Sequence, residues 1–182
     1  MLSKPPATRP DIPQSRRGLG LTLLTRTKNP SHLVQALYLS PTAVPHTFLS
    51  GKTAEDLGAT MGVHLVDPSY FFTERRWREH REGLGLPAEP FPSELKNAQV
   101  ANSDFTNAPK GTVGAVALDA DGRIAVLTST GGRTNKLVGR IGDTPLMGAG
   151  FWAEEWDQNA VGVSGTGDGD VRRTSPVTTS WH

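Results

Sequence analysis

The sequence predicts one domain of mixed α/β (α+β) class, with helices in its first half and antiparallel strands in its second half. Residues 29–40 and 53–61 repeat apolar side chains at the three- to four-residue spacing of an amphipathic helix. Residues 112–118 and 123–129 are short apolar, β-branched runs separated by a turn sequence. The length of 182 residues is ordinary for a single globular domain.

Composition and charge exclude several classes of function. The hydrophobic fraction of 36% and charged fraction of 20% fit a soluble protein, and no apolar run approaches the roughly 20 residues that span a bilayer. A formal net charge of +1 provides no concentrated basic surface for nucleic acid or an anionic membrane. The chain has no Cys, which fits a reducing compartment. We therefore expect a soluble, cytoplasmic protein that binds neither nucleic acid nor a membrane.

No motif for a metal or a cofactor is found in the sequence. The 5 His residues are scattered without the spacing of zinc ligands. Residues 119–122 (DADG) begin like a calcium loop, but the later acidic ligands are missing, so we expect a turn. The Gly-rich residues 165–170 lack the lysine of a phosphate-binding loop. We expect neither a metal ion nor a cofactor.

The first half of the chain is predicted to begin with a tail, a strand and a helix. Residues 1–18 are basic like an organelle targeting peptide, but their prolines would break the helix that such a signal needs, so we expect disorder. Residues 19–28 have the apolar, β-branched composition of a short strand. Asn29 and Pro30 predict the start of a helix that ends near Ser40.

Two further helices and a long linker are predicted next. Thr53 is the expected N-cap of the first of these helices, with Asp56 near its positive end. Three apolar side chains of that helix should face the core: Ala54, Leu57 and Met61. Residues 69–82 predict a charged helical segment whose charges stay in solvent. Residues 83–110 are rich in Pro, Gly, Ser and Asn and predict a linker, the kind of segment in which chains are cut.

The second half is predicted to be built from strands. Residues 112–118 and 123–129 should pair as an antiparallel hairpin through the turn at 119–122. Residues 160–164 suggest one more buried strand. In such a hairpin the end of the second strand returns to the level of the start of the first, which brings Thr130 near Thr112.

Five short blocks in the second half of the chain identify a family. They are residues 111–119 (GTVGAVALD), 128–132 (TSTGG), 139–145 (GRIGDTP), 148–150 (GAG) and 165–169 (GTGDG). In this order and spacing they resemble the start of the β-subunit of the plant-type asparaginase/isoaspartyl peptidase family, which consists of N-terminal-nucleophile (Ntn) hydrolases. Upstream, residues 29–30, 45–49 and 66–75 are similar to the end of that family's α-subunit. The resemblance covers residues 19–170.

The resemblance implies a fold and a division of the chain. The fold would be a partial four-layer αββα Ntn-hydrolase sandwich with mainly antiparallel sheets. Five parts follow: a disordered tail (1–18), the end of an α-subunit-like part (19–86), a flexible linker ending at an autocleavage site (87–111), the start of a β-subunit-like part (112–170) and an unrelated tail (171–182). The family's His-Gly-Gly-type strand does not precede Leu19, and its helical continuation does not follow Asp170. We therefore expect a chain truncated at both ends relative to the family.

Thr112 is the catalytic nucleophile that the resemblance implies. A threonine hydroxyl needs a base to take its proton, and an N-terminal threonine supplies that base in its own α-amine. The amine titrates near pH 8, close to working pH. Inside the chain this nitrogen is an amide, so the peptide bond between Gly111 and Thr112 must first be cut. Gly111 suits the scissile position because a residue without Cβ tolerates strained backbone geometry.

The resemblance assigns roles to five further residues. Thr130 matches the family's second active-site threonine, which hydrogen-bonds at the reacting centre. Arg140 and Asp143 match the pair that binds the α-carboxylate and the α-amine of the substrate, as fork geometry and opposite charge would favour. Thr166 and Gly167 match the oxyanion hole, in which fixed donors face the charge that develops on the carbonyl oxygen.

Three functions remain open at the level of sequence. The first is hydrolysis of L-asparagine or β-aspartyl (isoaspartyl) peptides after autoproteolysis, and the family would then assemble as a homodimer of α/β heterodimers on a small-molecule substrate. The second is a threonine-type endopeptidase of the related taspase kind, although Arg140 and Asp143 suit a small free amino acid better. The third is an inactive, truncated family member that acts, if at all, by association.

Overall fold

The computed structural model describes residues 2–3, 18–95, 111–157 and 159–167. Contacts within the chain divide it into two compact units. The first unit comprises Met1–Leu65, Gly111–Gly131 and Ile141–His182, and the second comprises Val66–Lys110 and Gly132–Arg140. The first unit therefore combines residues from both sides of the predicted cleavage site.

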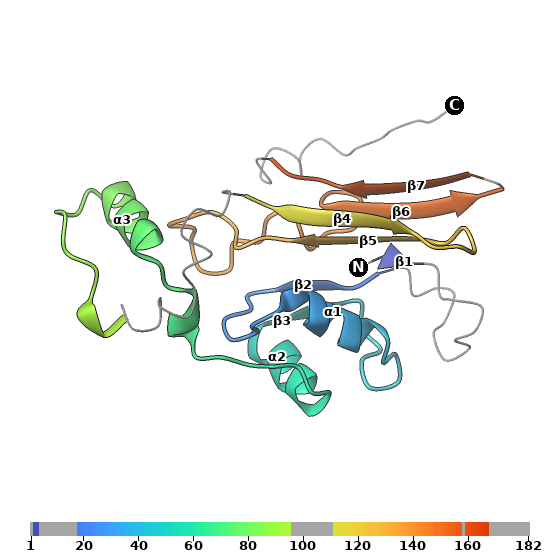
Figure 1. The fold of residues 1–182 in the computed structure, drawn as a ribbon, viewed down its shortest axis with the longest axis horizontal. Helices are drawn as coiled ribbons and strands as arrows, with labels where there is room; N and C mark the ends of the chain where they lie inside the picture. Colours follow the sequence, from blue (N-terminus) through green and yellow to red (C-terminus); the bar gives the residue numbers. More distant parts are fainter. Residues whose placement is uncertain (1, 4–17, 96–110, 158, 168–182) are drawn as a thin grey trace. The chain divides into compact units, whose positions relative to one another are not determined.

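The predicted hairpin is present in the first unit (Figure 1). Strands β4 (Val113–Leu118) and β5 (Ile124–Ser129) pair antiparallel over their full length. The Gly122 amide donates a hydrogen bond of 3.1 Å to the Asp119 carbonyl and closes the turn between them. Strand β1 (Leu2–Ser3) pairs antiparallel with the other edge of β5, so the sheet order is β1-β5-β4.

A second hairpin consists of β6 (Phe151–Trp156) and β7 (Asn159–Ser164), which also pair antiparallel. Strand β7 contains the predicted strand 160–164, but none of its residues is buried, so the expected burial was wrong. Strand β6 was not predicted. The two hairpins pack face to face, and they are in close contact at Gly162. A Cβ atom there would lie 2.5 Å from Val116 Cγ1 and 2.8 Å from Ile124 Cδ1. A small residue at this point lets the two sheets approach.

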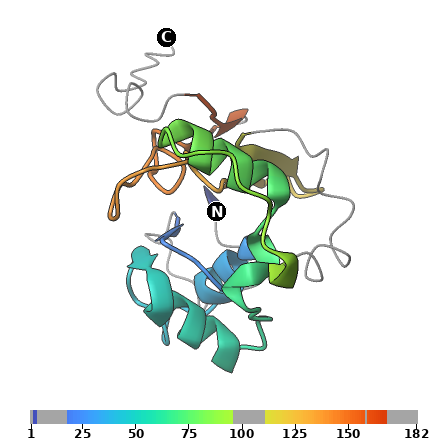
Figure 2. The same cartoon turned by 90° about the vertical axis from the view of Figure 1, so that its left-hand side faces the viewer.

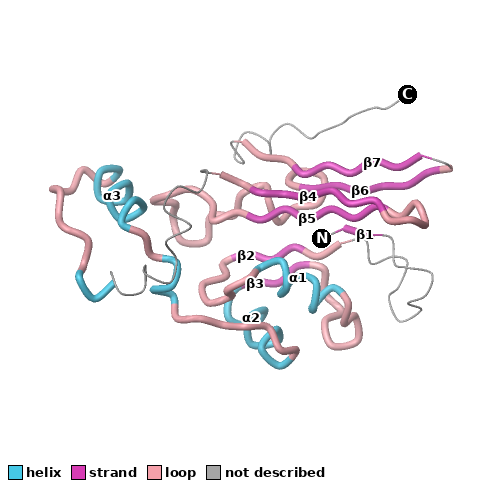
Figure 3. Tube along the Cα trace, viewed as in Figure 1, coloured by secondary structure: helices cyan, strands magenta, loops and turns pink. Residues whose placement is uncertain are grey.

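Helix α1 (Pro30–Tyr38) confirms the predicted helix after Asn29, and β2 (Gly20–Thr22) lies within the predicted strand 19–28. A short strand that was not predicted, β3 (Phe48–Ser50), pairs parallel with β2. The described sheets are therefore antiparallel except for this pair. Figure 3 marks their strands in magenta.

The predicted start of the second helix was wrong. Helix α2 (Gly51–Thr60) begins two residues before Thr53, and Ser50 holds the N-cap position. Because Thr53 lies inside the helix, it has no capping role, and Asp56 forms an ion pair with Lys52 one turn earlier. The predicted inward face is confirmed, since Ala54 is fully buried and Leu57 and Met61 pack against the core.

Two hydrophobic cores flank β5 in the first unit. One lies between the strand and the helices, and its buried members are Leu19, Leu33, Val34, Leu37, Tyr38, Val44 and Ala54. The other lies between the two hairpins and contains Ile124, Val126, Phe151 and Ala153. Neighbouring residues of β5 serve opposite cores, because Val126 belongs to the second and Leu127 packs against the first. The first unit thus has a helical layer and two β layers, which confirms the mixed α/β class (Figure 1).

The second unit divides the predicted helix 69–82 into two. A short 3₁₀ helix, η1 (Pro68–Phe71), is followed by α3 (Glu74–Gly83). Thr73 separates them because its hydroxyl caps α3 and accepts a hydrogen bond of 3.3 Å from the Arg76 amide. No residue of α3 is buried, which confirms for most of its charges that they stay in solvent. Arg81 is the exception, because its side chain is only 13% exposed and lies over the Trp77 ring.

The chain after α3 runs back along the helix, as Figure 2 shows in green. Phe91 is only 4% exposed and packs edge-to-face on Trp77, with 6.3 Å between the ring centroids. Arg81 donates a hydrogen bond of 2.9 Å to the Pro87 carbonyl. The first part of the predicted linker is therefore packed on α3. Residues 96–110, most of the tail 1–18 and the tail 171–182 lie outside the described residues.

Candidate active site

The two threonines that the sequence singled out lie directly beyond the last residue pair of the β4–β5 hairpin. Val113 is paired with Ser129 at the end of the ladder. Continued by one residue, the same register sets Thr112 opposite Thr130. Thr112 is half-buried and Thr130 is exposed.

Gly111, directly before Thr112, has a backbone conformation that side-chain-bearing residues avoid. Its φ angle is +132°, and a Cβ added there would meet no atom within 4 Å. The requirement for glycine is therefore one of backbone conformation and not of space.

Strand β7 approaches the Thr112 end of the hairpin through a pair of hydroxyls. The Oγ1 atom of Thr128 and the Oγ atom of Ser164 lie 2.8 Å apart, and Thr128 Oγ1 also donates to the Gly150 carbonyl at 3.2 Å. Gly114, which pairs with Thr128 across the hairpin, leaves room for Ser164, since a Cβ on Gly114 would lie less than 3.0 Å from its Oγ. Sequence reasoning missed Ser164, because only the pairing of distant strands shows its contact with Thr128.

The predicted oxyanion residues follow directly after this pair. Thr166 and Gly167 are exposed, and Gly167 has a φ angle of +146°. The Gly165 amide donates a hydrogen bond of 2.9 Å to the Gly150 carbonyl, which ties the segment to the start of β6.

Asp143 is a buried carboxylate in the same unit. It is 6% exposed, and the neighbouring Thr144 is 8% exposed. Among the described residues, no hydrogen-bond partner is found for its Oδ2 atom. The segment 143–145 is packed closely against two glycines. A Cβ at Gly150 would lie less than 3.0 Å from the Asp143 carbonyl, and a Cβ at Gly20 would lie less than 3.0 Å from the Pro145 carbonyl.

The predicted site residues are divided between the two units. Thr112, Thr130 and Asp143 belong to the first unit, together with Thr166 and Gly167. Arg140 is the last residue of the loop 132–140, which belongs to the second unit. It is half-buried, and its amide donates a hydrogen bond of 3.1 Å to the Leu137 carbonyl.

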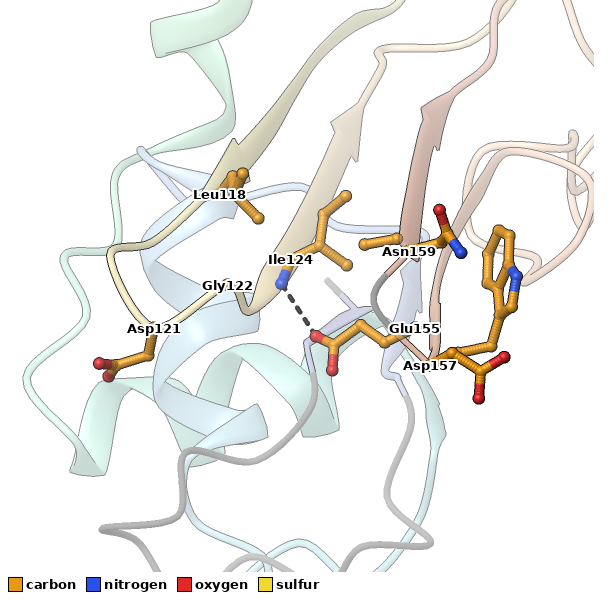
Figure 4. A pocket seen from close by; sticks show the side chains of 9 residues that line it. Leu118, Asp121, Gly122, Ile124, Glu155, Asp157 and Asn159 are labelled. Carbon is orange, nitrogen blue, oxygen red and sulfur yellow. Dashed lines mark hydrogen bonds between the residues drawn. The ribbon is translucent and has the colours of Figure 1, made fainter.

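An open pocket of about 570 Å³ lies at the opposite end of the two hairpins (Figure 4). Its lining includes Asp121 and Gly122 from one turn and Asp157 and Asn159 from the other, and Glu155 accepts a hydrogen bond of 3.0 Å from the Ile124 amide inside it. The six-residue length of β4, about 20 Å, separates this end from Thr112. The pocket therefore has no part in the candidate active site.

The described residues contain no group of three or more His, Asp or Glu side chains that could hold a metal ion. Within the same ranges, no helix is long and apolar enough to cross a membrane.

The chain is similar to several curated proteins. It is 40% identical over 134 residues to the isoaspartyl peptidase of Escherichia coli (strain K12), which covers 70% of this chain and 37% of that protein. It is 44% identical over 126 residues to the isoaspartyl peptidase/L-asparaginase of Rattus norvegicus, which covers 69% and 33% respectively. The probable isoaspartyl peptidase/L-asparaginase 2 of Arabidopsis thaliana is 35% identical over 183 residues, which covers 86% and 50%.

These alignments cover 33% to 50% of the relatives' own length, so the chain spans a third to a half of these proteins. The model of the asparaginase family matches residues 14–175, which is most of the chain. This match includes all five sequence blocks and both strands of the β4–β5 hairpin. The chain therefore belongs to the asparaginase family that includes the isoaspartyl peptidases.

Proposed function

We propose that this protein is an N-terminal threonine amidohydrolase, which hydrolyses L-asparagine or β-aspartyl (isoaspartyl) peptides after autoproteolysis between Gly111 and Thr112. The observation that carries the proposal is the register of the β4–β5 hairpin, which would set Thr112 opposite Thr130 if it continued one residue beyond the pair of Val113 with Ser129. Side chains alternate between the faces of a strand, so Thr112 shares a face with Gly114, and Thr130 shares one with Thr128. On that face, Gly114 and Thr128 lie against Ser164, two residues before Thr166.

In the proposed cleavage, the Thr112 hydroxyl attacks the Gly111 carbonyl, and the peptide C–N bond breaks to leave Gly111 as an ester on the Thr112 oxygen. Water then hydrolyses this ester and releases the Gly111 carboxylate. The positive φ angle of Gly111 is a conformation that glycine adopts readily, so glycine suits the residue before the bond to be cut. Cleavage leaves Thr112 with a free α-amine, which then accepts the proton of its own hydroxyl during attack on substrate. Thr130 would hydrogen-bond at the reacting centre, and Thr166 and Gly167 would stabilise the oxyanion.

Asp143 and Arg140 are the proposed substrate-binding residues. A buried carboxylate that lacks a hydrogen-bond partner for one oxygen is costly unless a cation or donor meets it, and the α-ammonium of a substrate is such a group. The Arg140 guanidinium would bind the α-carboxylate through two parallel hydrogen bonds. This pair favours a small amino-acid substrate over a folded protein.

The remaining features are proposed at the level of the family. The helical layer and two β layers of the first unit fit three layers of a four-layer αββα sandwich with mainly antiparallel sheets. On the basis of the family, we propose that the chain divides after residues 18, 86, 111 and 170. We also propose a homodimer of α/β heterodimers and a cytoplasmic location. A small-molecule substrate is the proposed partner, with no cofactor.

The test is the intact mass of the purified 182-residue chain, followed over time. We expect two fragments that join at Gly111/Thr112. The Thr112→Val variant keeps the β-branched shape but has no hydroxyl, so it should stay uncut, whereas Thr112→Ser should cut. A soluble, folded wild-type chain that stays uncut would contradict the proposal.

Hydrolysis of L-asparagine and of a β-aspartyl dipeptide is then compared with cleavage of protein substrates. Release of aspartate from either small substrate, absent in Thr112→Val, supports the proposed activity. Cleavage of a protein alone would replace it with a taspase-like endopeptidase. A chain that cuts itself but releases no product would be an inactive family member.

A further inference from the structure

The loop 132–140, which ends at Arg140, is held by few buried side chains. Leu137 and Val138 are 83% and 103% exposed. The loop also turns sharply, with φ angles of +74° at Gly132, +56° at Asn135 and +85° at Gly139. A loop with so little burial needs polar contacts to have a defined position.

Asn135 makes such contacts with the end of α3, within the second unit. Its Nδ2 atom donates a hydrogen bond of 3.0 Å to the His80 carbonyl. Its Oδ1 atom also contacts His80 Nδ1. The carbonyl contact fixes which end of the amide carries the protons, so Oδ1 is the acceptor and Nδ1 of His80 is the donor. The Asn135 side chain therefore hydrogen-bonds to both the backbone and the ring of His80, which is 55 positions away.

The Asn135 amide packs against Gly83, the last residue of helix α3. A Cβ atom on Gly83 would lie 2.5 Å from Asn135 Nδ2. That approach is too close for a carbon atom, so only glycine at this position leaves space for the amide against the last turn. Asn also suits its own position, because it tolerates a positive φ better than most residues.

We propose that Asn135 is a positioning residue that, through its hydrogen bonds to His80 at the end of α3, fixes the conformation of the loop bearing Arg140 within the second unit and so the affinity for the α-carboxylate of the substrate. The inference rests on the proposed function, because it takes Arg140 as the carboxylate ligand. It gives α3, which holds none of the predicted site residues, a part in substrate recognition.

Two variants remove the hydrogen bonds between Asn135 and His80 in different ways. Asn135→Gly removes the side chain and keeps a residue that accepts a φ of +56°. Gly83→Ala leaves Asn135 in place and favours the helix by about 1 kcal/mol, but its methyl group displaces the amide. Val138→Ala is the control, because it alters a fully exposed side chain in the same loop.

Steady-state kinetics with L-asparagine measure the effect on recognition. We expect both variants to raise KM about 5-fold and to change kcat by less than about 2-fold, as the net loss of one or two neutral hydrogen bonds would allow. With L-asparagine amide, which lacks the α-carboxylate, the variants and the wild type should have equal KM. Val138→Ala should match the wild type with both substrates.

Two further measurements separate this inference from the proposed function. Autocleavage at Gly111/Thr112 does not use Arg140, so it should proceed at the wild-type rate in both variants. Hydrogen exchange of the amides in 132–140 should be about 10-fold faster in both variants, whether or not the chain is active. Unchanged exchange, or unchanged KM for L-asparagine in a chain that cleaves itself, would overturn the inference. Absence of cleavage in the wild type contradicts the proposed function alone.

Discussion

Glu55 is a buried carboxylate that holds one loop of the first unit together. It is 1% exposed and lies in α2. Its Oε1 atom accepts hydrogen bonds from three consecutive backbone amides, those of Thr25 at 2.9 Å, Arg26 at 2.6 Å and Thr27 at 2.9 Å. The Thr27 hydroxyl adds a fourth at 3.1 Å. The loop between β2 and α1 therefore donates four hydrogen bonds to a single oxygen atom. These bonds compensate the free-energy cost of burying the carboxylate.

Substitutions of Glu55 should lower stability in a graded way. Glu55→Ala leaves three amides without an acceptor and should lower the free energy of unfolding by about 3 kcal/mol or more. Glu55→Gln keeps a carbonyl oxygen at the Oε1 position and loses only the charge, so about 1 kcal/mol is expected. Urea unfolding followed by circular dichroism measures both values. Equal losses in the two variants would show that shape, and not hydrogen bonding, accounts for the role of Glu55.

Sequence reasoning at the scale of residues succeeded where contacts are local. The antiparallel pairing of β4 with β5 could be predicted because one short turn joins the two strands. The contact of Glu55 with Thr27 and that of Asn135 with His80 join residues 28 and 55 positions apart. No local pattern encodes such pairs, since each depends on how separate elements pack.

At the scale of elements, strands with a clear apolar pattern were predicted and mixed ones were not. Strand β6 carries Glu154 and Glu155 among aromatic residues, and the Glu155 carboxylate accepts a hydrogen bond from the amide of Ile124, the first residue of β5. Strand β3 has only three residues and exists through parallel pairing with β2. The start of α2 was misplaced because a suitable capping residue, Thr53, lies one turn inside the helix.

The turn of the β4–β5 hairpin should weaken in acid. The Asp119 carboxylate accepts hydrogen bonds of 2.9 Å from the amides of Arg123 and Asp121, and Arg123 Nε donates to it at 2.8 Å. The Arg123 amide is the largest cause that lowers the pKa of Asp119 below its usual 3.8. A lowered folded-state pKa means that the carboxylate stabilises the turn above pH 3.8 and that this contribution is lost as pH falls below it.

Hydrogen exchange of the hairpin amides tests this expectation against Asp119→Asn. Near neutral pH, the variant should exchange faster than the wild type because it has lost the charged acceptor. As pH falls through the folded-state pKa of Asp119, the wild type protonates and the difference should close. A difference that does not narrow as pH falls below 3.8 would mean that the charge of Asp119 does not stabilise the turn.

At the scale of the whole molecule, the first unit is assembled from both sides of the proposed cleavage site. Strand β1 pairs with β5, which comes from the other side of Gly111. Leu127 of β5 packs against the core of α1 and α2. Gly20 in β2 lies directly against the Pro145 carbonyl. These contacts could not be predicted from the sequence, because local patterns identify elements and not which distant elements share a core.

The two fragments produced by cleavage should therefore remain bound to each other. Shared apolar burial, and not the cut peptide bond, holds the first unit together. We expect cleaved protein to elute as one species in size-exclusion chromatography, even on dilution to about 1 μM, and to separate into two bands only after denaturation. Co-expressed fragments 1–111 and 112–182 should copurify, and Leu127→Asp, which places a charge in the shared core, should reduce this association. Separate elution of the native fragments would mean that the contacts across the cleavage site are too weak to hold the unit together.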